Sequence, residues 1–237
     1  MKYITNILLV IAAVLIFQNC SHEDSFIYEV GEQYLFFERY KRISKTERVR
    51  IDTVFYSFTD YVGKTEITHF FKVGLIGDTL AEDTEYKIIV VDSLTTAKPE
   101  QYDLPEHPIF HKGSAVDSLG VTIYKAPLED EEVVLTLRLV ENSHFGLGYN
   151  GYLDARIRFN DDDSKPPKWW NREVELAYLG VFSKTKLNTI KAANPDFTGF
   201  DGLNATQKRK IALNTKDYIA EHNIIDENGK PMVIPMY

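Results

Sequence analysis

Hydrophobic and polar residues alternate with a period of two along most of the chain from Tyr34 to Asn160. This period places successive side chains on opposite faces of a strand and indicates strands with one buried face. The predicted strands span residues 34–37, 48–58, 66–76, 86–91, 121–124, 133–140 and 151–160. Because no helical pattern separates them, we predict a mainly β domain built as an antiparallel β-sandwich of the Ig-like type.

The alternation is clearest in the segment 66–76. Its odd-numbered residues are apolar or aromatic and share one predicted face, while Thr68, Phe70 and Lys72 share the other. The odd-numbered face is therefore expected to meet the core, and the even-numbered face to meet solvent.

The strand pattern ends at residue 160. Residues 161–168 combine three aspartates with two prolines and predict a linker. Beyond it the strand period vanishes, and the sequence predicts helices over 171–179, 184–193, which Pro195 ends, and 206–222. We therefore expect the sandwich at 33–160, a linker at 161–168 and a small, mostly helical C-terminal region at 169–237. At that size the helical region is expected to pack on the sandwich or on a partner.

The first residues of the chain indicate its compartment. Lys2 precedes an unbroken apolar run over 7–17, and the only cysteine of the chain, Cys20, follows closely. The run is shorter than the roughly 20 residues that a membrane-spanning helix needs, which is typical of a secretory signal. The layout resembles a bacterial lipoprotein signal, which implies removal of residues 1–19 and acylation of Cys20. An ordinary signal peptide with a chance cysteine and an uncleaved anchor are the alternatives.

The residues after the cysteine suggest the destination. Ser21, His22, Glu23 and Asp24 resemble the export signal of lipoproteins displayed on the outer face of some Gram-negative cells. We therefore expect residues 20–32 to form an acylated tether in the outer membrane, with the protein facing the cell exterior. Since each buried acyl CH₂ group contributes about 0.8 kcal/mol of membrane affinity, two or more chains suffice to hold the protein.

Charge and cysteine content narrow the partners further. The formal net charge is −8, so we expect no nucleic-acid partner. Cys20 has no second thiol to pair with, so an intramolecular disulfide is excluded and apolar packing must hold the fold.

Two aromatic groups are candidate ligand sites. Trp169 and Trp170 stand at the junction between the predicted sandwich and the helical region, where they could form a flat platform for a sugar ring. The alternative is a hydrophobic wedge that fixes the helical region to the sandwich. Tyr149 and Tyr152, on the glycine-rich hairpin that leads into the last predicted strand, are further platform candidates.

Asp161 and Asp163 are better candidates for a metal site than the acidic run 129–132. Calcium is bound by several carboxylate oxygens, and loops at the ends of a sandwich can bring such oxygens together. The alternative is a solvated acidic turn, the commoner meaning of such a run. Apart from this structural Ca²⁺, no cofactor is expected.

The remaining motifs do not indicate catalysis. The run 146–151 has the spelling of a dinucleotide fingerprint, but a strand follows it where that motif requires a helix. No nucleophile elbow and no H-E-x-x-H zinc motif is present, and no carboxylate pair stands out. We therefore expect a protein that is not an enzyme.

Across nearly its whole length the chain resembles a family of surface lipoproteins of unknown function found beside SusC/SusD-like nutrient importers. The resemblance rests on the signal ending in Cys20, on the segments 34–37, 52–58, 133–140 and 178–184, and on Trp169 with Trp170. The sandwich also resembles Calx-beta and fibronectin-type modules.

This resemblance implies a non-catalytic accessory subunit of an outer-membrane uptake complex. Such a subunit binds a glycan or a peptide, or docks onto the SusC/SusD-like transporter. A stand-alone glycan-binding lipoprotein and an adhesion or pilus-type structural subunit are the alternatives. The last of these predicts an unpaired strand or groove for strand exchange.

Overall fold

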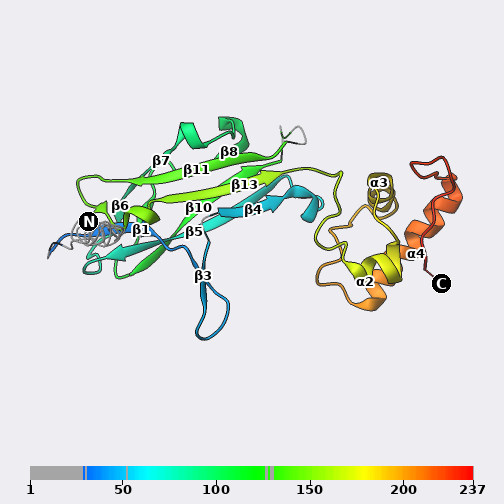
Figure 1. The fold of residues 1–237 in the computed structure, drawn as a ribbon, viewed down its shortest axis with the longest axis horizontal. Coiled ribbons are helices and arrows are strands. Elements are labelled where there is room, and N and C mark those ends of the chain that lie inside the picture. The colour runs from blue at the N-terminus through cyan, green and yellow to red at the C-terminus, as the bar shows by residue number, and fades with distance from the viewer. Residues whose placement is uncertain (1–28, 30, 52, 126–127, 129–130, 237) are drawn as a thin grey trace, which may run out of the picture.

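The structure, a computed structural model, describes residues 29, 31–51, 53–125, 128 and 131–236. Figure 1 shows the strands gathered into one body and the helices α2 to α4 into another. In the described part of the chain all strands end by Asn160, and the α-helices begin at Arg172. The predicted fold class, mainly β with a helical C-terminal region, is confirmed.

Thirteen described strands build the β body. They are β1 (Tyr34–Phe37), β2 (Tyr40–Arg42), β3 (Arg48–Arg50), β4 (Thr53–Ser57), β5 (Glu66–Ile76), β6 (Thr84–Glu85), β7 (Lys87–Val90), β8 (Tyr102–Asp103), β9 (Ile109–Phe110), β10 (Val116–Tyr124), β11 (Val133–Val140), β12 (Gly146–Leu147) and β13 (Asp154–Asn160).

Two sheets carry the sandwich. The five-stranded sheet has the order β12-β1-β5-β10-β8, and the four-stranded sheet has the order β4-β13-β11-β7. Two short hairpin-like pairs, β2-β3 and β6-β9, lie outside them. Most pairs in the two sheets are antiparallel, as predicted, but β1 pairs with β12 in parallel and β4 pairs with β13 in parallel.

The core lies between the two sheets. The odd-numbered residues of β5 face it, as the alternation predicts, and Val73 is fully buried there. The neighbouring strand β10 and the facing strands β11 and β13 contribute buried residues at the same spacing: Leu119, Val121, Ile123, Leu135, Leu137, Leu139, Ala155, Ile157 and Phe159. Thr68, Phe70 and Lys72 lie on the outer face of the five-stranded sheet, because side chains alternate across a strand.

Three strand predictions had the wrong bounds. The segment 48–58 is not one strand, because β3 pairs with β2 whereas β4 joins β13 in the four-stranded sheet. The segment 151–160 becomes a strand only at Asp154, after a 3-10 turn over Asn150–Tyr152. Strand β10 begins at Val116, five residues earlier than predicted, because polar residues and a glycine interrupt its apolar pattern.

The helical region contains α2 (Arg172–Val174), which continues as a π-helical turn (Glu175–Leu179), followed by α3 (Lys184–Ala193) and α4 (Ala205–His222). Asparagine and serine caps explain where these helices begin. The side chain of Asn171 accepts a hydrogen bond from the Val174 backbone N–H, and that of Ser183 accepts one from Lys186. Asn204 and Gln207 form a reciprocal capping box at the start of α4.

The helical region has a core of its own. Its buried residues are Val62, Trp169, Trp170, Val174, Leu179, Leu187, Ile190, Phe197, Phe200, Ala212, Ile219, Met232, Ile234 and Met236. Val62 belongs to the β body, in the loop between β4 and β5, and it joins the two bodies by packing into this second core. Beside it the carboxylate of Asp60 accepts a hydrogen bond of 2.6 Å from the Lys168 backbone N–H.

Among the residues that the structure describes, no helix combines the length and the apolar character that crossing a membrane requires.

Candidate functional site

The outer face of the five-stranded sheet carries three aromatic residues, each directly opposite a glycine. Phe70 on β5 pairs with Gly120 on β10, Phe36 on β1 pairs with Gly74 on β5, and Tyr34 on β1 pairs with Gly146 on β12. A glycine has no Cβ, so the ring opposite can lie down across the neighbouring strand.

The distances show that the rings occupy this space. A Cβ added at Gly120 would stand 3.2 Å from Cε1 of Phe70, and one added at Gly146 would stand 2.7 Å from Cδ1 of Tyr34. A Cβ at Gly74 would collide with the ring of Phe36. The rings therefore lie flat on the sheet.

These rings and one neighbour form what we call the aromatic face, which consists of Tyr34, Phe36, Phe70 and Tyr149. Tyr149 meets Phe36 edge to face, with ring centroids 5.6 Å apart. Phe70 is 64% exposed and Tyr149 is 45% exposed, whereas Tyr34 is buried. Phe70 and Gly74 are four residues apart on β5, so the two exposed ends of the face are separated by about 13 Å along the strand.

A groove of about 490 Å³ runs beside the aromatic face, between the outer face of β10 and the segment 103–111. We call it the β10 groove. It is lined by Thr68, Tyr86, Asp103, Pro105, His107, Pro108, Ile109, His111, Ser118, Leu119, Gly120 and Thr122. Because Gly120 lines the groove and also supports the ring of Phe70, the aromatic face borders the groove directly.

Hydroxyl groups and one carboxylate supply the polar chemistry of the β10 groove. The hydroxyls of Thr68 and Thr122 are hydrogen-bonded to each other at 2.9 Å. Asp103 is the cross-strand neighbour of Thr122 on β8, and its side chain is exposed. Hydroxyls both donate and accept hydrogen bonds, whereas an ionised carboxylate only accepts them.

A proline explains why the groove exists. Strand β8 pairs with β10 only at Asp103 with Thr122 and at Tyr102 with Ile123. Continuing this register would place Pro105 opposite Gly120, and proline has no N–H to donate to a ladder. Within the described residues the pairing ends there, and the edge of β10 at Gly120 opens onto the groove.

Two histidines fix the segment that forms the far wall of the groove. Nδ1 of His107 lies 2.9 Å from Oε1 of Glu85, and Nδ1 of His111 lies 2.7 Å from Oδ2 of Asp117. The hydrogen bond to the carboxylate, followed by its charge, raises the pKa of each imidazole.

Asp117 also holds the backbone of this wall. Burial acts to raise the pKa of its carboxyl, but hydrogen bonds from the backbone N–H groups of His111 and Ser118 outweigh burial, and the pKa is lowered. The carboxylate therefore fixes one end of the wall to β10.

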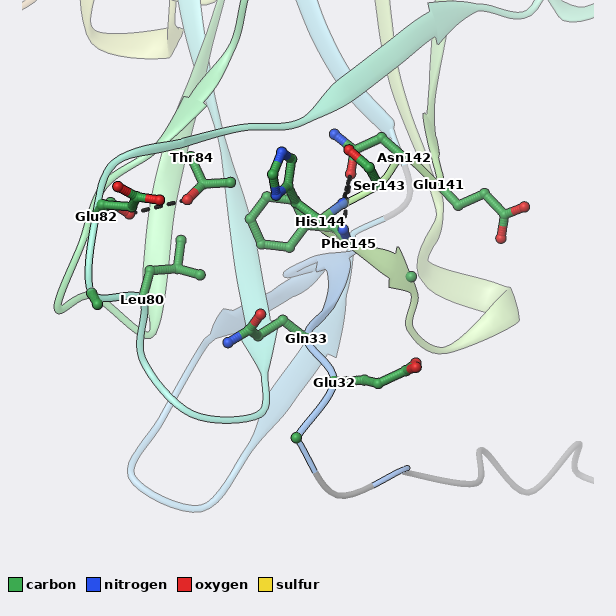
Figure 2. Close-up of a pocket in the computed structure, with 13 residues that line it drawn as sticks. Glu32, Gln33, Leu80, Glu82, Thr84, Glu141, Asn142, Ser143, His144 and Phe145 are labelled. Atoms are coloured by element: carbon green, nitrogen blue, oxygen red, sulfur yellow. Dashed lines mark hydrogen bonds between the residues drawn. The ribbon is translucent and has the colours of Figure 1, made fainter.

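A second hollow lies at the opposite end of the sandwich from the helices. This cavity has a volume of about 590 Å³, and Figure 2 shows its side chains coming from three separate segments, 31–33, 80–84 and 141–146. Three glutamates line it, Glu32, Glu82 and Glu141, but the described residues contain no group of three or more potential metal ligands close enough to hold an ion. Phe145 is buried, so its ring does not offer a free face for stacking.

The structure contradicts the platform predicted at the two tryptophans. Trp169 is 1% exposed and Trp170 is 5% exposed. Trp169 stacks on Phe200 with ring centroids 5.7 Å apart, and the indole N–H of Trp170 donates to the carbonyl of Gly180 at 3.0 Å. Their large apolar area is used in the second core, so the wedge interpretation fits and the sugar platform is wrong here.

The predicted calcium ligands are occupied by lysines. Asp161 forms an ion pair with Lys125 at 2.9 Å, and Asp163 forms one with Lys184 at 2.7 Å. Calcium needs six to eight oxygen ligands. No cluster of three acidic or imidazole groups occurs among the described residues, so the expected site is not formed at these aspartates.

The other predicted residues divide into two groups. Tyr149 and Tyr152 meet edge to face at 5.8 Å, and Tyr149 belongs to the aromatic face. Cys20, with Ser21, His22, Glu23 and Asp24, lies outside the described residues.

Phe70, Phe36 and Asp103 did not emerge as site residues from the sequence. The alternation in 66–76 placed Phe70 on the solvent face, and a large aromatic residue there is a signal that could have been followed. The role of Phe36 depends on the register that brings Gly74 opposite it. The place of Asp103 in the groove depends on the pairing of β8, a strand of two residues, with β10. Neither of these pairings is written in local sequence.

Comparison with solved structures gives matches of low sequence identity. A protein of unknown function from Bacteroides ovatus is 15% identical with a TM-score of 0.38, and the match covers 53% of this chain and 43% of that one. A two-domain protein of unknown function from Bacteroides fragilis is 12% identical with a TM-score of 0.39, covering 54% and 45%. The apo form of the Calx CBD1 domain is 13% identical with a TM-score of 0.37, covering 55% and 98%. The match thus spans less than half of each Bacteroides chain.

Comparison with curated proteins gives no match. A family model does match, over residues 28–192, which include every strand of the sandwich and the helices α2 and most of α3. The family is described as a domain of unknown function, DUF4843, and this chain belongs to it.

Proposed function

We propose that this protein is a non-catalytic, lipid-anchored protein of the outer membrane that binds glycans at the cell surface. In this proposal Cys20 carries the acyl anchor, and the aromatic face together with the β10 groove forms the binding site. The observation that carries it is Phe70, an exposed ring that lies flat on the sheet and borders a groove lined with hydroxyls.

The chemistry of a sugar suits both parts of this site. A pyranose ring has an apolar face of C–H groups that packs on an aromatic ring, and hydroxyls around its rim that need hydrogen-bond partners. Phe70 supplies the flat apolar surface, and Thr68, Thr122 and Asp103 supply acceptors and donors beside it. A second exposed ring, Tyr149, lies farther along the same face and suits an extended chain of sugars.

The arrangement of carboxylates favours binding over hydrolysis. Glycosidases use a pair of carboxylic acids on either side of the scissile bond. In the β10 groove Asp103 has an exposed carboxylate, whereas Asp117 already accepts hydrogen bonds from His111 and Ser118. A glycan held there meets one available carboxylate and a ring.

We further propose that the protein works as an accessory of a SusC/SusD-like importer, delivering glycans to it. The proposal rests on the resemblance to surface lipoproteins found beside such importers. Solubilising the membranes in mild detergent and isolating the full protein tests it, because a large barrel protein is expected to co-purify. Recovery of this lipoprotein alone contradicts the importer role but leaves glycan binding untouched.

Affinity electrophoresis of the full mature protein in gels containing plant or microbial polysaccharides tests glycan binding. Phe70→Ala is expected to weaken retardation by about tenfold in apparent affinity, because the stacking surface is lost. Phe55→Ala is the matched control, since Phe55 is also an exposed phenylalanine, 41% accessible, but lies on β4 in the other sheet. Equal effects of the two substitutions, or no retardation of the wild-type protein by any polysaccharide, would contradict the proposal.

The anchor has a separate test. Cys20→Ala is expected to move the protein from the outer-membrane fraction to the soluble fraction, because no acyl chain can be attached. Mass spectrometry of the mature wild-type protein should show acyl groups on Cys20, and an unmodified N-terminus at another residue would contradict the anchor.

A further inference from the structure

We infer that the β10 groove selects uncharged glycans and discriminates against acidic ones, with Asp103 as the residue that sets this preference. The inference rests on the proposed glycan-binding function and names the class of ligand. It depends on three features of the groove: its charge, the position of Asp103 and the contrast with the opposite sheet.

Carboxylates outnumber cationic groups around the groove. Asp103 lines it, Asp117 and Glu85 pair with its two histidines, and Glu106 stands beside one of them. Lys72, opposite the groove residue Ser118, is paired with Glu38 at 3.7 Å, so these two charges cancel. Even when both imidazoles carry a proton, the other four carboxylates leave a net charge of −2. A carboxylate or sulfate on a sugar would meet like charge here, which is a standard means of rejecting a wrong ligand.

Asp103 is placed to bind hydroxyls. It lies opposite Thr122 in the register, and Thr122 bonds to Thr68 on the next strand, so three polar side chains form a row across β8, β10 and β5. No hydrogen bond or ion pair involves the carboxylate of Asp103 within the described part of the chain, in contrast to Asp117. Two oxygens with about four acceptor positions can take the hydroxyls of neighbouring sugar carbons.

The position of Asp103 relative to Phe70 completes the site. The row of Asp103, Thr122 and Thr68 is next along the sheet to the row of Gly120 and Phe70. Residues two apart on a strand are about 7 Å apart, which is close to the width of one sugar ring with its substituents. Asp103 also lies one strand over, on β8, so it is about 8 Å diagonally from Gly120, which lies beneath the ring of Phe70. A sugar packed on Phe70 can therefore extend its hydroxyls toward Asp103.

The outer face of the four-stranded sheet has the opposite character. Arg138, Arg156 and Arg158 project from β11 and β13 there. Arg138 is paired with Asp154 and Arg158 with Glu132, so among the described residues Arg156 is the arginine of this group that has no ion pair. An acidic polymer that binds this protein is therefore expected on that sheet, through Arg156, and its binding would not depend on Phe70. This gives the experiment a way to locate any acidic ligand.

The test is affinity electrophoresis of the full mature protein against two sets of polymers. The neutral set is xylan, glucomannan and xyloglucan, and the acidic set is polygalacturonate and chondroitin sulfate. At least one neutral polymer is expected to retard the wild-type protein, and Phe70→Ala is expected to weaken that retardation. Any retardation by an acidic polymer is expected to be the same in the wild type and in Phe70→Ala. Asp103→Asn is expected to weaken neutral binding by roughly tenfold, the scale of a lost charge-assisted hydrogen bond.

Two controls keep the result interpretable. Glu100→Gln removes one exposed negative charge from the same surface segment without touching the groove and is expected to bind like the wild type. Unchanged thermal unfolding of Asp103→Asn shows that the fold is intact, and Asp103→Ser provides a second substitution.

The outcomes separate this inference from the proposed function. Phe70-dependent binding of acidic polymers, or neutral binding that is unchanged in Asp103→Asn and Asp103→Ser, overturns the inference and leaves glycan binding standing. Acidic binding that is lost on Arg156→Gln but kept in Phe70→Ala supports the assignment of the two faces. Failure of every polymer to bind overturns the proposed function itself, and the inference with it.

Discussion

Phe70 lies directly over Gly120, its cross-strand partner, and its Cε1 comes within 3.2 Å of where a Cβ on that glycine would be. The ring is 64% exposed although it is large and apolar. It can lie in this position because Gly120 has no side chain to occupy the same space. The same pairing recurs at Phe36 with Gly74. Gly120 and Gly74 therefore serve to make room for aromatic rings on the surface of the sheet and do not form turns.

Gly120→Ala is therefore expected to impair binding more than folding. The added methyl group must lift the ring of Phe70, an exposed side chain that can move at little cost to stability. We expect glycan affinity to fall several-fold, while the unfolding free energy changes by less than about 1 kcal/mol. Affinity electrophoresis and chemical denaturation measure the two effects.

Gly74→Ala should show the reverse balance. Its Cβ would collide with the ring of Phe36, which is only partly exposed and is held on one side by Tyr149. Overpacking of this kind destabilises a protein by about 1–3 kcal/mol. A Gly74→Ala protein with wild-type stability would show that Phe36 moves as freely as Phe70, and would contradict the expectation that Tyr149 holds Phe36 in place.

Trp169→Ala is expected to destabilise the helical region without affecting glycan binding. The side chain is buried among Phe197 and Phe200, and removing a buried tryptophan typically costs about 3–5 kcal/mol. Denaturation followed by far-ultraviolet circular dichroism should show early loss of helical signal. Leu176→Ala, at an exposed position of the same region, is the control and should unfold like the wild type.

Asp60→Ala is expected to loosen the junction between the two bodies. It removes the acceptor of the Lys168 backbone N–H and the ion-pair partner of the Lys168 ammonium group, 3.0 Å away. A hydrogen bond to a charged group contributes about 1.5–3 kcal/mol. Limited proteolysis should then cut the linker 161–168 faster, whereas Asp78→Ala, in an exposed turn, should leave the rate unchanged.

The wall of the β10 groove should respond to pH through His111. Its pKa is raised above the ordinary value of 6.5 by the hydrogen bond to Asp117. A raised pKa in the folded state means that this contact stabilises fully below pH 6.5 and is lost as the pH rises through the folded-state value. Titration of the imidazole signals by NMR measures it. Asp117→Asn should lower the pKa of His111 and leave that of His107 unchanged, and a shift of both would contradict the separate pairing.

The architecture was largely predictable because alternation reports which face of a strand is buried. In 66–76 it placed Val73 in the core and Phe70 outside, as found. Alternation does not report strand partners. The division of 48–58 between two sheets, and the parallel pairing of β4 with β13, depend on contacts between residues about a hundred positions apart.

The candidate site was less predictable for the same reason. Trp169 and Trp170 were prominent in the sequence, yet large aromatic side chains at a junction are where a small core gains most from burial. The sequence showed Phe70 as an aromatic residue on the outer face, but the flat position of its ring depends on Gly120, which lies fifty residues later in the chain. The groove depends on the register between β8 and β10, whose continuation would place Pro105 opposite Gly120, and only the folded chain shows that register.

The chain enters the sandwich at the end that carries the three-glutamate cavity, and the helices lie beyond the other end (Figure 1). Cys20 and Gly31 are eleven positions apart in the sequence, which corresponds to at most about 40 Å of chain. If Cys20 is acylated and this tether holds the entry end of the sandwich near the lipid, the helices lie farthest from the bilayer. Strand β5 then runs toward the bilayer, because it begins after Val62 on the helical side and ends at Ile76, opposite Tyr34. A polysaccharide bound along β5 would then lie roughly perpendicular to the membrane, with one end close to the bilayer.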